Sequence, residues 1–280
     1  MSIRPGWIVL AAKETIMQAS KKIAVAGATG RVGRHIVDVL TTGGHDVVAI
    51  SRSCGVDLVT GEGLAEALAG VECVIDAATG PSPDEKAATD FFVAATRNLH
   101  EAGRRAGVRR IVVVSIIGID RFAGGYSAAK IAHERAMLAG PIPARVLRAA
   151  QFHEFVAQLV EWGRRGDVSY VPKMRTQLVA ARTVARALAD LAVAPDSATA
   201  GSSGAPFSEI AGPRVENLVD MARLLAARRG DPVKIETASD PANPDHVLFE
   251  SGALLPGPQA TLAGPTFEEW LDGEGKLSPG

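Results

Sequence analysis

Two residues with complementary acid–base chemistry, Tyr126 and Lys130, stand four positions apart. Four residues span about one turn of a helix, so the phenol and the ammonium would share one helix face. An ammonium near a phenol favours the phenolate and lowers the pKa of the phenol. Such a tyrosine can exchange a proton with a carbonyl or alcohol oxygen while a hydride moves to or from a nicotinamide. Alternatively, Lys130 is a solvated helix residue and Tyr126 packs at a lobe boundary.

A glycine-rich turn follows the first predicted strand directly and opens a predicted helix, with the spacing Gly27-x-x-Gly30-x-x-Gly33. The first glycine allows a tight turn, and the second lets backbone N–H groups approach a pyrophosphate at the helix N-terminus. The third permits close packing of the helix on the sheet. The turn predicts a dinucleotide site whose binding residues are Gly27, Thr29, Gly30, Arg31, Val32 and Gly33.

The end of the second predicted strand indicates which dinucleotide is preferred. A site for NAD(H) usually carries Asp or Glu there to hold the ribose hydroxyls. This chain has Ser51, Arg52 and Ser53 instead. A guanidinium between two hydroxyls suits a 2'-phosphate, which favours NADP(H) over NAD(H), and Arg31 would add a second positive charge at the same phosphate. The alternative for Arg52 is a solvated surface arginine.

Asp57 and Leu58 follow shortly after this strand. They would flank the adenine, with the Asp57 carboxylate accepting a hydrogen bond from its amino group. Alternatively, Asp57 merely caps a turn.

The elements that must position these residues alternate between short apolar runs and longer amphipathic segments. Continuously apolar runs predict buried parallel strands at 23–26, 46–50, 73–77, 110–115 and 144–147. Amphipathic segments predict helices at 31–42, 62–69, 85–106 and 125–139. Asp84 is the predicted N-cap of the third helix. The alternation predicts an α/β fold with a doubly wound parallel sheet of the Rossmann type.

The chain divides into three predicted parts: an N-terminal extension at 1–20, an NAD(P)-binding Rossmann domain at 21–150 and a smaller C-terminal substrate lobe at 151–280. In the lobe, the pattern predicts helices at 151–164, 183–193 and 214–228 and strands at 168–171 and 176–181. We expect the lobe to pack over the carboxyl edge of the sheet, where ligands bind in such folds. Gln151, Phe152 and His153 follow the last strand of the domain and are the predicted substrate-binding residues. Alternatively, Phe152 is a core residue and His153 is a structural, hydrogen-bonded histidine.

Composition excludes several classes of function. The net charge of -1 and the 5% aromatic content give no basis for binding nucleic acid. The apolar runs fall short of the ~20 residues that cross a bilayer, so no membrane association is expected. Cys54 and Cys73 lack the pattern of a disulfide framework or a zinc site, and the six histidines are scattered, so no metal is expected. We expect a cytoplasmic monomer or homodimer that acts on a small molecule.

Several motifs together resemble the atypical short-chain dehydrogenase/reductases, in the NmrA-like, NAD(P)H-binding branch related to nucleoside-diphosphate-sugar epimerases. They are GATGRVG at 27–33, VIDAA at 74–78, ATRNL at 95–99, GVRRIVVVS at 107–115, YSAAK at 126–130, AGP at 211–213 and TFEEWL at 266–271. The resemblance implies that Tyr126 is the acid–base residue and that Lys130 tunes it and holds the nicotinamide ribose. It also implies that Ala77 and Ala78 contact the cofactor.

One position departs from the family pattern. Related active enzymes carry a hydroxyl residue just past the strand that ends near residue 115, and the corresponding position here is Ile117. Ser115 stands two residues earlier. It either completes a catalytic Ser115–Tyr126–Lys130 constellation or simply ends the strand.

Three functions are compatible with these residues. The first is hydride transfer between NADP(H) and a small organic carbonyl, alcohol or activated alkene. Some NmrA-like relatives bind a dinucleotide without turning anything over, so the second is a non-catalytic NADP(H)-binding redox sensor. The third is a sugar-nucleotide epimerase or dehydratase with tightly held NAD.

Overall fold

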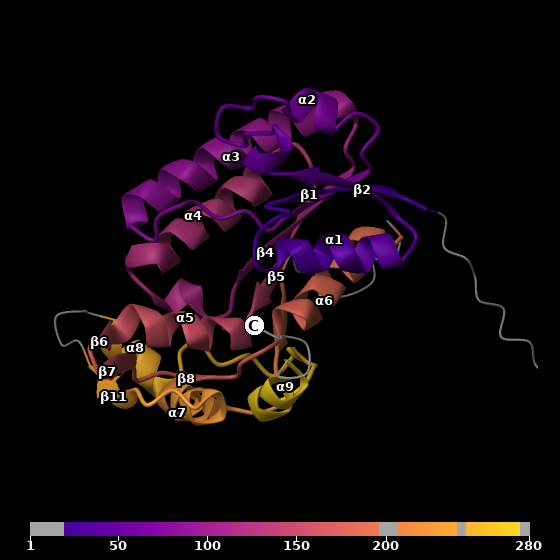
Figure 1. Ribbon diagram of the computed structural model, residues 1–280. Coiled ribbons are helices and arrows are strands. Elements are labelled where there is room, and N and C mark those ends of the chain that lie inside the picture. The colour runs from indigo at the N-terminus through magenta and orange to yellow at the C-terminus, as the bar shows by residue number, and fades with distance from the viewer. Residues whose placement is uncertain (1–19, 196–206, 240–244, 275–280) are drawn as a thin grey trace, which may run out of the picture.

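The computed structural model describes residues 20–195, 207–239 and 245–274. A layered α/β body carries a smaller lobe on one side (Figure 1). The predicted extension at 1–20 lies, apart from its last residue, outside the described residues.

A seven-stranded sheet forms the centre of the body, in the order β12-β9-β5-β4-β3-β1-β2, and every neighbouring pair is parallel. Its strands are β1 (Lys22–Ala26), β2 (Asp46–Ile50), β3 (Cys73–Asp76), β4 (Arg110–Ile116), β5 (Ala144–Ala149), β9 (Phe207–Ala211) and β12 (Thr261–Leu262). The first five lie where the continuously apolar runs predict them. Such runs arise because helices cover both faces of a parallel sheet.

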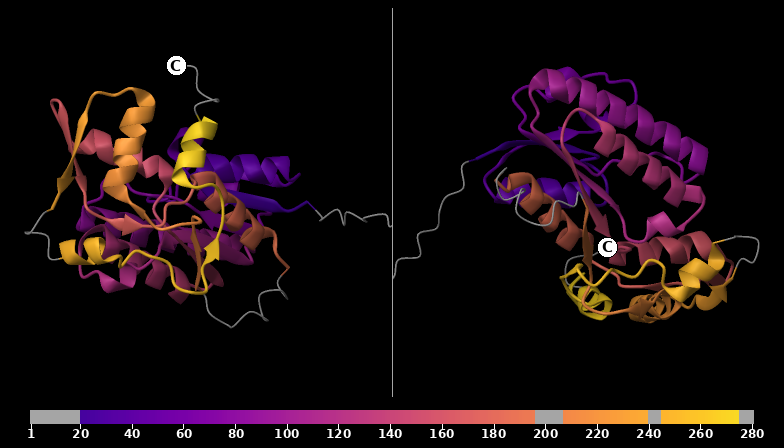
Figure 2. Two further views of the ribbon diagram at one scale, coloured as in Figure 1. Left: turned by 90° about the horizontal axis from the view of Figure 1, so that it is seen from below. Right: turned by 180° about the vertical axis from the view of Figure 1, so that it is seen from behind.

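Two pairs of helices cover the two faces of this sheet (Figure 1 and Figure 2). One face carries α1 (Gly33–Thr42) and α6 (Ala181–Val193), and the other carries α3 (Glu85–Ala106) and α4 (Gly125–Ala139), with the short α2 (Leu64–Ala67) beside α3. The ranges of α3 and α4 match the prediction, and Asp84 caps α3 by accepting a hydrogen bond from the Ala87 amide at 2.9 Å. Short 3-10 turns at η1 (Arg52–Cys54) and η2 (Ile119–Arg121) follow β2 and β4.

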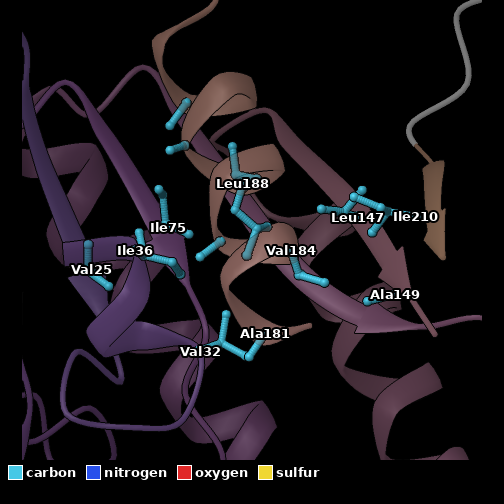
Figure 3. Packing of buried hydrophobic residues seen from close by; sticks show 14 of the residues in the cluster. Val25, Val32, Ile36, Ile75, Leu147, Ala149, Ala181, Val184, Leu188 and Ile210 are labelled. Carbon is cyan, nitrogen blue, oxygen red and sulfur yellow. The ribbon is translucent and has the colours of Figure 1, made fainter. Parts of the chain in front are cut away.

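The core between the sheet and the α1–α6 face consists of fully buried aliphatic side chains (Figure 3). Val25 of β1 packs with Ile36 of α1 and with Val184 and Leu188 of α6, all of them 0% exposed. Burying each of these side chains contributes about 1.5–3 kcal/mol, so this layer holds the glycine turn rigidly against the sheet.

The lobe has a core and sheets of its own. Its elements are α5 (His153–Gly163), β6 (Arg164–Arg165), β7 (Val168–Pro172), β8 (Arg175–Thr176), β10 (Glu216–Asn217), α7 (Leu218–Arg229), β11 (Lys234–Ala238), α8 (His246–Ser251) and α9 (Phe267–Glu274). Strands β11, β7 and β6 form one small sheet, and β10 pairs with β8 in another. The structure has no described helix long and apolar enough to span a membrane.

The lobe differs from the prediction in two respects. First, the boundary predicted at residue 150 does not separate the two parts, because α6, β9 and β12 return to the central sheet and its cover. Second, residues 177–180 are not a strand. They are buried between the body and the lobe, where only Val179 forms an isolated bridge, to Phe152. The apolar pattern there reflects burial and not strand pairing.

Candidate cofactor and catalytic site

The glycine turn connects β1 to α1 at the carboxyl edge of the sheet. Gly27 has a φ of +74°, and its amide donates to the Ile50 carbonyl at 3.0 Å. A Cβ on Gly27 would lie 2.7 Å from Ala78 Cα, and one on Gly33 would lie 2.0 Å from the Gly27 carbonyl oxygen. Backbone therefore touches backbone on both sides of the turn, which is the geometry that the glycine spacing predicts.

The start of α1 fits a bound anion. The first turn of α1 carries no acidic residue. Within the described part of the chain, the Arg31 and Val32 amides have no backbone acceptor. Gly30 is exposed, and a Cβ there would meet only the Gly27 carbonyl, at 3.1 Å. Free amides and the positive end of the helix dipole suit the pyrophosphate of a dinucleotide.

The end of β2 presents a cation and two hydroxyls. Arg52 is exposed in η1, and the Ser51 and Ser53 hydroxyls on either side lie 2.9 Å apart. Arg31 points elsewhere, because its guanidinium donates to Gln158 Oε1 of α5 at 2.6 Å. The expectation that Arg31 adds a second charge beside Arg52 is not met in this arrangement. Arg31 instead connects the glycine turn to the lobe.

Asp57 caps a turn, which is the second of the two alternatives. Its Oδ1 accepts hydrogen bonds from the Val59 amide at 2.7 Å and the Thr60 amide at 3.1 Å. Leu58 is 8% exposed and belongs to the core cluster on the α3 side of the sheet, and its contact with adenine stays a prediction. Ala77 and Ala78 are half-buried directly after β3.

Tyr126 lies in the first turn of α4, half-buried, with its hydroxyl 3.0 Å from Thr79 Oγ1. Burial raises the pKa of Tyr126; the hydrogen bond to Thr79 opposes this rise, and the Asp76 charge adds to it. The predicted lowering of the tyrosine pKa is therefore wrong for this arrangement. The phenol keeps its proton at neutral pH and can act as an acid.

Lys130 is buried and turned into the core. Its ammonium donates to the Val114 carbonyl and to His133 Nδ1, both at 2.9 Å, and lies 4.7 Å from the centre of the Phe92 ring. The ammonium thus has two hydrogen-bond partners, and its charge lies over an aromatic face. Burial lowers the pKa of Lys130 to about 8, against the charges of Asp76 and Glu134. Lys130 is thus neither solvated nor bonded to the phenol.

His133 links Lys130 to the end of β3. Its Nε2 lies 3.0 Å from Asp76 Oδ2, and Asp76 Oδ1 accepts from the Ala78 amide at 3.0 Å. Although burial raises the pKa of Asp76, the bonds from His133 and Ala78 outweigh it, and that pKa lies below its usual value. Burial and the Lys130 charge lower the pKa of His133. The imidazole is therefore neutral, with Nε2–H donating to Asp76 and Nδ1 accepting from Lys130.

Two carboxylates hold α4 in place. Glu134 accepts from Arg148 Nε at 3.0 Å and from its Nη2 at 2.8 Å, in a bidentate pair that joins α4 to β5. Glu85 Oε2 accepts from the Gly125 amide at 2.7 Å, which places a negative charge at the α4 N-terminus. These contacts hold the helix that carries Tyr126 against β5 and α3.

Ser115 does not reach the phenol. It is 3% exposed, and among the described residues its Oγ has no hydrogen-bond partner. Ile117 is 1% exposed in the core. The hydroxyl that contacts Tyr126 is that of Thr79, so the structure does not support Ser115 as the catalytic partner.

The residues after β5 point in different directions. Gln151 is half-buried and accepts a hydrogen bond from Thr176 Oγ1, while Phe152 packs partly against the core. His153 is 0% exposed, has Nε2 3.1 Å from the Pro265 carbonyl, and lies against the rings of Phe267 and Trp270 in α9. Burial lowers the pKa of His153 to about 4. His153 therefore docks the last helix as a structural, hydrogen-bonded histidine, which is the second of the two alternatives, and not as a substrate-binding residue.

Thr79, His133, Asp76 and Glu85 were not predicted as site residues. His133 stands one helical turn after Lys130, and Asp76 is a charged residue at the end of an apolar strand, so a signal for this pair existed. Thr79 lies in a loop with no periodic pattern, and no sequence signal marks it. Across the described ranges there is no cluster of three or more His, Cys, Asp or Glu that could hold a metal.

Comparison with known protein families gives a match over most of the body. A family described as NAD(P)H-binding matches residues 27–195, more than half of the chain. The photosystem II assembly factor Ycf39 of Synechocystis sp. is 32% identical over 110 residues, which cover 34% of this chain and 34% of that protein. The chain thus matches about a third of the length of this relative.

Three solved structures illustrate the similarity in fold. MoeE5 in complex with UDP-glucose and NAD has a TM-score of 0.64 at 20% identity, with 92% of this chain and 100% of that chain covered. The UDP-N-acetylglucosamine 4-epimerase from Bacillus cereus has a TM-score of 0.65 at 16% identity, covering 92% and 96%. An NADPH-dependent quinone oxidoreductase from Escherichia coli has a TM-score of 0.59 at 18% identity, covering 90% and 99%. At these identities the likeness shows the fold, and it confirms the predicted Rossmann-type architecture.

Proposed function

This chain belongs to the NAD(P)H-binding family, and from that premise we propose that it is an NADP(H)-dependent oxidoreductase of the short-chain dehydrogenase/reductase type. Its substrate is a small organic carbonyl or activated alkene, or the corresponding alcohol. The observation that carries the proposal is the position of Tyr126. Its hydroxyl contacts Thr79, next to Ala78, and Ala78 packs directly against Gly27 of the glycine turn. A proton donor thus stands beside the turn that would hold the dinucleotide.

The preference for NADP(H) rests on the end of β2. Arg52 is exposed and flanked by the Ser51 and Ser53 hydroxyls, and within the described residues its guanidinium forms no hydrogen bond to the protein. A 2'-phosphate brings two negative charges that a guanidinium and hydroxyls can bind, whereas ribose hydroxyls alone would leave the guanidinium without an anionic partner.

The chemistry follows from the protonation state of Tyr126. When bound, NADPH supplies a hydride to the substrate carbon. Tyr126 gives its phenolic proton to the substrate oxygen, and the resulting phenolate recovers a proton from water. Because the raised pKa keeps the phenol protonated at neutral pH, the residues favour reduction over oxidation. The free amides at the start of α1 would hold the pyrophosphate, and the Arg52 guanidinium would hold the 2'-phosphate.

The Tyr126→Phe variant tests the proposal. We expect NADPH oxidation with a panel of small carbonyl compounds and activated alkenes to fall about 10²–10⁴-fold, because the variant lacks the acidic proton. NADPH affinity, measured by fluorescence titration, should stay unchanged. Full turnover by the variant would refute the assignment of Tyr126.

Titration with both dinucleotides tests the preference. We expect NADPH to bind more tightly than NADH, and the difference to disappear in Arg52→Ala. Tighter binding of NADH to the unchanged chain would contradict the preference.

A second candidate function, a non-catalytic NADP(H) sensor, is favoured by one observation. The Lys130 ammonium contacts Val114, His133 and the Phe92 ring, and so the lysine expected to tune the tyrosine is bonded to other groups. The carbonyl panel discriminates the two. A sensor would bind NADPH and show no turnover with any compound, and Tyr126→Phe would then change neither property.

A further inference from the structure

We propose that Thr79 is the positioning residue for Tyr126, with a hydroxyl that directs the phenol and donates to the phenolate as the proton leaves. This inference deepens the proposed function and rests on it. The Tyr126 hydroxyl and Thr79 Oγ1 lie 3.0 Å apart, and either atom can be the donor. When Thr79 donates, the phenolic proton is free to point at a substrate oxygen.

Thr79 is held by the loop on either side of it. On the β3 side, the Ala78 amide is bonded to Asp76 Oδ1 at 3.0 Å. On the α3 side, a Cβ on Gly80 would lie 3.1 Å from Phe91 Cγ, so the backbone runs tightly against that ring. The loop then ends in the Asp84 cap of α3. With both neighbours fixed, the hydroxyl of Thr79 stays within reach of α4 although the residue is exposed.

The Tyr126 ring is fixed as well. It packs against Phe92 with a centroid distance of 6.1 Å, in a cluster with Ala88 and Ala129. The Gly125 amide before it is bonded to Glu85. Two side chains on independently anchored elements thus meet through their hydroxyl oxygens, and this reduces the entropy lost in aligning them.

The negative charges near the Tyr126 phenol oppose its ionisation, whereas the Thr79 hydroxyl favours it. The Asp76 carboxylate after β3 opposes ionisation of the phenol, as burial does. Glu85 of α3 carries a second negative charge near the start of α4. Lys130 of α4 directs its ammonium at Val114 and His133. The hydrogen bond from Thr79 lowers the pKa of Tyr126, because it stabilises the phenolate more than the phenol.

The first experiment measures the ionisation of Tyr126 directly. The chain has only two tyrosines, Tyr126 and Tyr170. In a Tyr170→Phe background, incorporated fluorotyrosine gives a single ¹⁹F NMR signal whose pH titration reports Tyr126. We expect Thr79→Val, which keeps the shape and removes the hydroxyl, to raise the midpoint by about one pH unit. Thr79→Ser should restore the original midpoint.

The second experiment measures turnover in the same variants. We expect Thr79→Val to lower kcat about tenfold with unchanged NADPH affinity, and Thr79→Ser to recover most of the rate. Thr89→Val in α3, which loses a local hydrogen bond to the Glu85 carbonyl, is the matched control and should change neither readout.

An unchanged Tyr126 titration midpoint in Thr79→Val would overturn the proposal. A midpoint that shifts in Ser115→Ala and not in Thr79→Val would overturn it as well, because Ser115 would then be the hydroxyl that acts on Tyr126. The titration needs no substrate. If Tyr126→Phe retains full turnover, the proposed function fails, while the titration still decides the role of Thr79 at Tyr126. Circular dichroism confirms that each variant is folded.

Discussion

The glycine-turn half of the sheet edge, residues 27–33 and 51–58, is held mainly by contacts of the backbone. The tyrosine half, residues 76–79, 115–134 and 148–153, is held by side chains that meet from different elements. Gly27 and Gly33 leave no room for a Cβ, whereas Lys130 and Glu134 are placed by partners on β4 and β5 and on their own helix. Backbone geometry restricts the residue type strictly, and so it leaves a visible signature in the sequence. A side-chain network can be built from many residue types and leaves a weaker one.

The largest expected effect is the loss of stability when a buried ion pair of the tyrosine half is broken. Glu134→Ala removes the bidentate partner of Arg148, and the two side chains are only 4% and 15% exposed. We expect the free energy of unfolding to fall by about 3 kcal/mol, at the lower end of the range for a broken buried pair. The largely buried guanidinium loses its bidentate partner and keeps only the exposed Asp120 carboxylate, 3.0 Å from Nη1. Urea unfolding measures the change.

Lys86→Ala is the matched control for this pair. Its partner Asp90 forms an ion pair on the surface of α3, with side chains 84% and 63% exposed. We expect no resolvable change in the free energy of unfolding, because solvent screens an exposed ion pair. Equal losses in the two variants would mean that the tyrosine half does not depend on its buried pair.

The second expected effect is a pH dependence of the free energy of unfolding, caused by His153 in the tyrosine half. Its pKa in the folded chain is about 4, against 6.5 when unperturbed, because the ring is buried. Between these values the unfolded chain binds a proton that the folded chain does not, so stability falls as the pH drops from 6.5 to 4. The loss at pH 4 is about 3 kcal/mol.

Urea unfolding between pH 4 and pH 7 checks this expectation. The difference between the unchanged chain and His153→Phe isolates the histidine, since the other titrating groups are common to both. We expect a flatter profile in the variant. Two parallel profiles would show that the pKa of His153 is the same in the folded and the unfolded chain, which contradicts a ring held neutral by burial against α9.

The smallest expected effect concerns the glycine-turn half. Gly33→Ala places a Cβ 2.0 Å from the Gly27 carbonyl oxygen, so the turn must shift. We expect a loss of about 1–3 kcal/mol in unfolding free energy and about tenfold weaker NADPH binding. Gly273→Ala, where a Cβ meets nothing within 4 Å, is the control and should change neither. Unchanged NADPH affinity in Gly33→Ala would separate the turn from the dinucleotide site.

Much of the body could be predicted from the sequence because its elements follow strong periodic patterns. The ranges of α3 and α4 and the five strands from β1 to β5 follow from apolar runs and glycine ends. The structure of the lobe was harder to predict from the sequence. Its short strands and the return of α6, β9 and β12 to the central sheet depend on contacts between distant segments, which no local pattern specifies.

The site shows the same division. The sequence indicated the glycine turn, Arg52 and Tyr126, and the structure places them along one sheet edge. It did not indicate that Lys130 turns inward or that His153 docks α9. Both outcomes depend on whether a partner stands within hydrogen-bond reach, and the partners Val114 and Pro265 are backbone carbonyls that come from other elements.

The order of elements could be predicted from the sequence, as could the glycine turn and the position of the residues at the end of β2. Each of these depends on local backbone geometry or on a single side chain. The partners of Tyr126 and Lys130 were settled in the folded molecule. Thr79 lies 47 residues before Tyr126, and such a contact forms only when the sheet brings the β3 loop beside the start of α4. When two elements are held in place by different parts of the molecule, tertiary packing decides which of their side chains come into contact. The spacing of those residues in the sequence does not.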